Sequence, residues 1–125
     1  MQAKKLLHTL LEKACATMHG HRFSSLLTCC NALLLGQRLT LTQIGRAINN
    51  QVAAKHNIKK VDRLLSNPRL DQECFSIYAS LAQTFLLNVK APVILVDWSD
   101  LTPTRSHFLL RAALAVKGRP ITLYE

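Results

Sequence analysis

The spacing of apolar residues predicts helices in the first part of the chain. In the opening segment, the residues that share one helical face are Leu6, Leu7, Leu10, Leu11 and Ala14. This pattern predicts a helix from about residue 2 to about residue 18, which ends near Gly20. Residues 23–35 are apolar around more than half of the helical circumference and are followed by Gly36, so we expect the central helix of a bundle there.

Two helices joined by a turn are predicted next. Thr40 or Thr42 is suited to cap a short helix over residues 43–48, and residues 49–51 (Asn-Asn-Gln) are typical of a turn. An amphipathic helix is expected over residues 56–65. Its apolar stripe consists of Ile58, Val61, Leu64 and Leu65. The bases that face away from this stripe are Lys59, Lys60 and Arg63.

A fifth helix, and then a change to strands, complete the predicted order. The helix is expected over residues 71–87, with Asp71 as its cap. The β-branched run 93–96 predicts a buried strand that ends where a loop begins at Asp97. The two further strands and the turn that joins them are expected at 108–116, 121–124 and 117–120. We therefore predict an α+β fold, an all-α bundle followed by an antiparallel meander.

The net positive charge of the chain, and its concentration in the first half, indicates a binding partner. The 125 residues carry a formal net charge of +9, and 49% of them are hydrophobic, which excludes a disordered chain. Residues 1–68 hold ten Lys and Arg against two acids, whereas residues 69–125 are almost neutral. A basic half of this kind favours a polyanionic partner, first of all nucleic acid. The alternative is a basic face that is merely solvated.

No segment predicts a signal peptide or a membrane span. The start resembles a signal peptide, but His8, Glu12 and Lys13 interrupt its apolar core. The second apolar stretch, residues 85–96, contains Asn88, Lys90 and Pro92 and is too short to cross a bilayer. We therefore expect a soluble protein of the cytoplasm with no membrane partner.

The four cysteines allow two interpretations. Cys15, His19 and His21, with Cys29 further on, have a spacing that a zinc site can use. Alternatively, reduced cysteines fill the core as small apolar groups. The adjacent pair Cys29-Cys30 is a poor basis for a disulfide framework.

Residues 39–67 have the organisation of a helix-turn-helix module. Such a module places its second, basic helix in the major groove of DNA. The residues expected to contact DNA are Arg46, Lys55, His56, Lys59, Lys60 and Arg63. The turn is longer than a strict helix-turn-helix requires, and the alternative is a basic helix that is solvated and packs on the bundle.

Asp97 is the candidate catalytic residue. A carboxylate that directly follows a buried strand is held rigidly, which suits it to bind Mg²⁺ beside a phosphate. The alternative is an aspartate that caps the turn formed by Trp98, Ser99 and Asp100.

Three motifs together resemble a known family. They are Leu39-Thr40-Leu41-Thr42-Gln43-Ile44-Gly45-Arg46, Lys55-His56-Asn57-Ile58-Lys59-Lys60-Val61-Asp62-Arg63-Leu64-Leu65 and Val93-Ile94-Leu95-Val96-Asp97-Trp98-Ser99-Asp100. With Gly118 to Glu125, they resemble the amino-terminal part of bacterial cut-and-paste transposases of insertion-sequence family four. The resemblance implies a helical domain over residues 1–90 that binds the terminal inverted repeats of the transposon. It further implies that residues 91–125 are the first three strands of an RNase H-like catalytic domain.

In that family, a DDE triad binds Mg²⁺, and Asp97 matches its first acid. The second Asp and the Glu have no counterpart in this sequence, and Glu125 falls on the wrong element to be that Glu. We therefore expect a truncated transposase fragment that does not cleave DNA alone. The alternatives are a DNA-binding regulator that inhibits full-length transposase, in part by forming mixed oligomers with it, and a decayed remnant.

Overall fold

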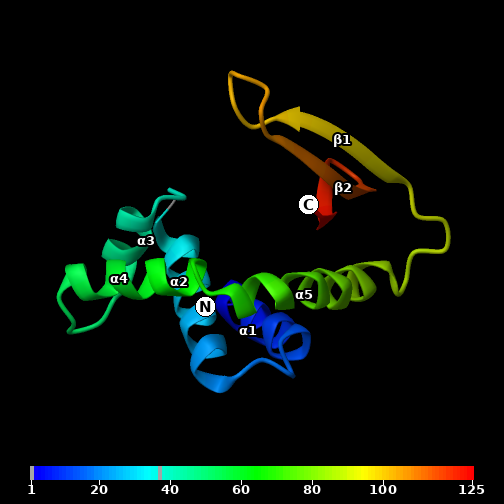
Figure 1. Ribbon diagram of the computed structural model, residues 1–125. Coiled ribbons are helices and arrows are strands. Elements are labelled where there is room, and N and C mark those ends of the chain that lie inside the picture. Colours follow the sequence, from blue (N-terminus) through cyan, green and yellow to red (C-terminus); the bar gives the residue numbers. More distant parts are fainter. Residues whose placement is uncertain (1, 37) are drawn as a thin grey trace. The chain divides into compact units, whose positions relative to one another are not determined.

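The computed structural model describes residues 2–36 and 38–125, in which five helices precede three strands (Figure 1). The helices are α1 (Gln2–Ala14), α2 (Gly20–Gly36), α3 (Leu41–Ala47), α4 (Ala54–Leu65) and α5 (Pro68–Leu86). The strands are β1 (Ile94–Asp100), β2 (Phe108–Val116) and β3 (Arg119–Tyr124). This order confirms the predicted α+β class.

Two compact units divide the chain, residues 1–74 and residues 75–125, so the division falls inside α5. The boundary predicted from the sequence lies after residue 90, where the helical pattern ends, and it stays a prediction. The two units are described separately below.

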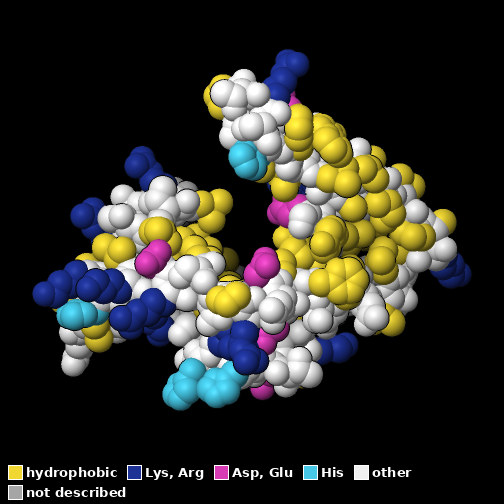
Figure 2. Space-filling model, viewed as in Figure 1, with side chains coloured by type: hydrophobic (Ala, Val, Ile, Leu, Met, Phe, Trp, Pro, Cys, Tyr) yellow, Lys and Arg dark blue, Asp and Glu magenta, His cyan; other side chains and the backbone are white. Residues whose placement is uncertain are grey.

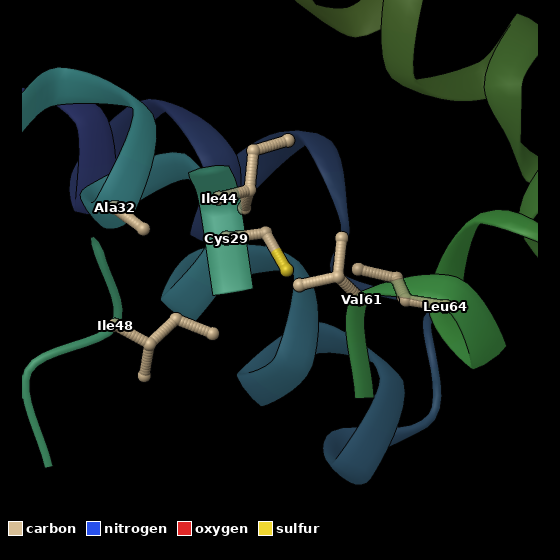
Figure 3. Close-up of a cluster of buried hydrophobic side chains, with 6 residues drawn as sticks. All are labelled: Cys29, Ala32, Ile44, Ile48, Val61 and Leu64. Atoms are coloured by element: carbon tan, nitrogen blue, oxygen red, sulfur yellow. The ribbon is translucent and has the colours of Figure 1, made fainter. Parts of the chain in front are cut away.

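The first unit is built around α2, which packs against α1, α3 and α4. One cluster of its buried side chains combines residues of α2, α3 and α4, in which Cys29 on α2 points toward Val61 on α4 (Figure 3). Val61 is only 1% exposed. The central position predicted for the helix over residues 23–35 is therefore confirmed.

Helix boundaries differ from the predictions where polar side chains cap the backbone. Of the two candidate caps for α3, it is Thr40 whose hydroxyl accepts the N–H of Gln43, at 3.3 Å. The prediction that Asp71 caps α5 is wrong, because α5 begins at Pro68 and Asn67 Oδ1 accepts the N–H of Arg69 at 3.0 Å. Proline suits a first helical position because its missing N–H has no partner to lose there.

Smaller differences occur at other helix ends. α1 ends at residue 14 rather than 18, α2 begins at residue 20 rather than 23, and α4 begins at residue 54 rather than 56. His19 fixes the start of α2, because its carbonyl accepts the N–H groups of Arg22 and Phe23 at 2.9 and 3.0 Å.

The second unit contains an antiparallel sheet in which the strand order is β1-β2-β3. Gly118, with a φ of 88°, forms the tight turn between β2 and β3, a conformation that glycine adopts without steric cost. The buried residues of the sheet are Ala113, Leu114 and Leu123. From the same unit, the Tyr78 ring of α5 contacts the Tyr124 ring, with centroids 5.3 Å apart.

β1 is longer and more exposed than predicted. It continues through Asp97 to Asp100, and Asp97 pairs with Arg111 on β2. The prediction of a buried strand that ends before Asp97 is therefore wrong. β1 is an edge strand, and its apolar side chains are exposed, with Val96 at 68% and Trp98 at 62%. Hydrophobic side chains are spread over the sheet in Figure 2.

Over the residues that the structure describes, none of the helices is long and apolar enough to cross a membrane.

Candidate nucleic-acid interface

The position of α4 is set by its close contact with α3. Gly45 lies on α3 where that helix meets Ile58 of α4. A Cβ atom at residue 45 would lie 2.6 Å from Ile58 Cγ1 and 2.7 Å from the Ile58 backbone. Only glycine allows the two backbones to approach this closely, so Gly45 fixes the packing of α3 against α4.

A pair of asparagines fixes the link between these helices. Asn57 on α4 is only 4% exposed, and its amide exchanges two hydrogen bonds with that of Asn50, at 2.9 and 3.1 Å. Asn50 Oδ1 also accepts the N–H of Val52 at 3.1 Å. Because a buried amide needs partners, this network holds residues 48–53 in one conformation. The start of α4 is therefore held rigidly.

The basic side chains of α4 face solvent. Lys55, His56, Lys59 and Arg63 are exposed, and Lys60 is half-buried. Figure 2 shows Lys and Arg gathered over this helix. None of the described residues forms an ion pair with the lysines or the arginine of α4. The positive charge of this helix is therefore available to an external anion.

A depression of about 710 Å³ lies beside α4. From α4 it is lined by His56, Lys59, Lys60 and Arg63. On another side it is lined by His19, His21 and Arg22, at the start of α2. The structure thus gathers four of the six predicted DNA-binding residues around one hollow, whereas Arg46 and Lys55 lie outside it. Arg46 is exposed, on the last turn of α3.

Arg22 differs from the other bases of the depression because it has a partner. Its Nε donates to Glu73 Oε2 at 2.7 Å, and its Nη2 donates to Glu73 Oε1. Hydrogen bonding to Arg22 lowers the pKa of Glu73 and keeps its carboxylate charged. This pair ties α2 to the beginning of α5, so Arg22 is structural and its charge is largely neutralised.

His19 and His21, like Arg22, line this surface although the sequence did not assign them to DNA binding. The sequence placed them in a candidate zinc set, because their spacing from Cys15 suits metal ligands. The useful signal was the pattern His-Gly-His-Arg at the start of a helix. That pattern alone does not indicate which other helix it faces.

The structure favours the core interpretation over the zinc interpretation for Cys15 and Cys29, which are buried, whereas Cys30 is half-buried and Cys74 is exposed. Cys29 belongs to the buried cluster with Val61 and Leu64. Burial raises the pKa of the Cys29 thiol, which opposes formation of the thiolate that zinc requires. Within residues 2–36 and 38–125, no three His, Cys, Asp or Glu side chains are grouped so that they could hold a metal ion.

Asp97 lies in the middle of β1, not in a loop. Its carboxylate accepts a hydrogen bond from Ser99 Oγ at 2.8 Å, and it is exposed. Its cross-strand neighbour Arg111 donates to Glu125 Oε2, at 2.9 and 3.0 Å. A two-metal site needs several carboxylates around both ions. The described residues near Asp97 do not fit Mg²⁺ as a complete site, and no catalytic step follows from them.

Comparisons of this chain with models of protein families, with curated proteins and with solved structures found no match.

Proposed function

We propose that this chain binds double-stranded DNA through the exposed face of α4, as the end-binding part of a cut-and-paste transposase. The observation that carries the proposal is a set of basic side chains that form no ion pair with the described residues, on a helix whose position is fixed by Gly45 and Asn57. Because backbone phosphates dominate affinity for DNA, a rigid helix with free cations is suited to this ligand.

In this proposal α4 is the recognition helix of a helix-turn-helix module. Lys59 and Arg63 lie one turn apart on α4, so both reach phosphates along one strand of the duplex. Lys55 and His56, at the start of α4, lie where such helices contact base edges. Arg46 would contact the backbone from α3.

The transposase part of the proposal rests on the sequence motifs. In such a protein, the duplex is a terminal inverted repeat of the transposon and Asp97 is the first acid of an RNase H-like domain. Mg²⁺, when bound, activates water for attack on a phosphodiester bond. Asp97 supplies one ligand only, so the proposal assigns this chain binding of DNA without cleavage.

A DNA-binding regulator of transposition is the second candidate. It is favoured because α4 carries basic side chains that form no ion pair with the described residues, whereas Asp97 belongs to no group of carboxylates among those residues that could hold a metal ion. Such a chain would occupy transposon ends, or form mixed oligomers with full-length transposase, and thereby inhibit transposition.

Selection from a pool of random duplexes tests the DNA-binding proposal. We expect the full chain to enrich one sequence motif, and we expect Lys59→Gln together with Arg63→Gln to weaken retention of that motif. A pool that stays random while retention is strong would contradict end recognition. Failure to retain any duplex would contradict DNA binding itself.

A nicking assay tests the catalytic assignment. A supercoiled plasmid that carries the enriched motif is incubated with Mg²⁺ and the chain, and we expect it to stay intact. Nicking that is abolished by Asp97→Asn would show that the chain cleaves DNA and would overturn the assignment.

A further inference from the structure

The depression beside α4 contains more groups that can bind an anion than α4 alone supplies. His19 and His21 face it from the start of α2, and both are exposed. No Asp or Glu side chain lines it among the described residues. Glu73, the carboxylate that pairs with Arg22 of this cluster, is engaged by that arginine. The hollow is therefore a cationic surface built from two helices and not from α4 only.

The two histidines at the start of α2 have ring nitrogens that can donate hydrogen bonds into the hollow. His19 Nδ1 accepts the backbone N–H of His21 at 3.4 Å. In the neutral ring, the proton is then on Nε2, because the nitrogen that accepts a bond carries no hydrogen. The rings of His19 and His21 lie 5.5 Å apart and are tilted by 31°. Two imidazoles side by side thus offer N–H groups at the rim of the hollow.

The surrounding charges define the ligand. From α4 the groups that face these imidazoles are His56, Lys59, Lys60 and Arg63, and from the link before α5 it is Asn67. Arg22 faces them from α2 itself. All of these groups donate hydrogen bonds or carry positive charge, so a multivalent anion that accepts several hydrogen bonds fits. A phosphate group has this chemistry.

We propose that this depression binds a backbone phosphate of the DNA duplex, with His19 and His21 contacting it from α2 while α4 contacts the neighbouring phosphates. This inference rests on the proposed DNA binding and adds a second helix to the contact. Because imidazoles gain positive charge between about pH 8 and about pH 5, phosphate binding there strengthens as the pH falls.

The test measures the affinity of the full chain for a mixed-sequence duplex at pH about 7.8 and about 5.8, at constant salt. We expect wild-type affinity to rise about tenfold or more at the lower pH, the size of one hydrogen bond to a charged group. His21→Gln should reduce this ratio and, because it removes a contact to the phosphate, weaken binding at both pH values. His107→Gln, an exposed histidine of the second unit, is the matched control and should keep the wild-type ratio.

A second readout follows the imidazoles directly. On addition of duplex at the lower pH, the ring nitrogen resonances of His19 and His21 should shift, whereas that of His107 should not. A wild-type ratio near one, or a ratio that His21→Gln and His19→Gln both leave unchanged, would overturn the phosphate site while salt-dependent DNA binding remained. Absence of binding at both pH values would instead overturn the proposed function, and this inference with it.

Discussion

Replacing two basic residues of α4, Lys59 and Arg63, gives the sharpest test of DNA binding. Five basic side chains of α3 and α4 make no ion pair with the described residues: Arg46, Lys55, Lys59, Lys60 and Arg63. If each neutralises one phosphate, the logarithm of affinity falls with the logarithm of salt concentration with a slope of about −4.5. The double variant Lys59→Gln/Arg63→Gln loses two contacts, so its slope becomes about −2.7.

These slopes separate the two proteins over an accessible salt range. Between about 50 mM and about 200 mM salt, the wild-type chain should lose affinity about 500-fold and the double variant only about 40-fold. Fluorescence anisotropy of a labelled duplex of about 20 base pairs, titrated at several salt concentrations, measures both slopes.

The control removes the same charge from the second unit. Lys90→Gln/Lys117→Gln lowers the net charge equally, and both lysines are exposed. If this control reduces the slope as much as the α4 variant does, the net charge of the chain governs binding. The assignment of the contacts to α4 would then be refuted.

Three other predictions concern the unit that carries this surface. Gly45→Ala should destabilise it by about 1–3 kcal/mol in urea unfolding, because the added Cβ overlaps Ile58; Gly20→Ala, which meets no atom within 4 Å, should not. Asn57→Leu should cost about 1–3 kcal/mol, because Val52 and Asn50 lose their buried partner, and an unchanged unfolding midpoint would contradict the role of the network. Glu73 has a lowered pKa, so its pairing with Arg22 stabilises the fold above the ordinary glutamate pKa, and this stabilisation is lost as the pH falls through the lowered one. Glu73→Gln should therefore melt below wild type at pH 7 and approach it only as the pH falls below the ordinary glutamate pKa, whereas Glu12→Gln, at an exposed position of α1, should follow wild type throughout.

Hydrophobic spacing was enough to predict the type and the order of the elements. The stripe containing Val61 and Leu64 does form the inner face of α4, because only that face can be removed from water. Boundaries were less predictable since several residues can cap the same helix. Asp71 and Asn67 are both good caps, and the choice depends on Pro68, which begins α5.

The error at Asp97 has a different origin. Aspartate and serine are typical of loops, so residues 97–100 resembled a turn in the sequence. In the structure they are held in β1 by pairing with residues 108–111 of β2, a partner strand beyond the loop. Such pairing overrides local preference. Similarly, His19 and His21 meet α4 only through the packing of α2, which no local pattern encodes.

The simple strand order of the sheet has a consequence for how the protein forms. Each strand pairs with its neighbour in the chain, and α3 likewise packs against α4, its neighbour. Contacts between near neighbours close short loops, which cost little chain entropy and are typical of fast folding. Because synthesis proceeds from the amino terminus, residues 1–74 can reach their folded state while the sheet is still being translated. The surface formed by α2 and α4 can then be complete before β3 leaves the ribosome.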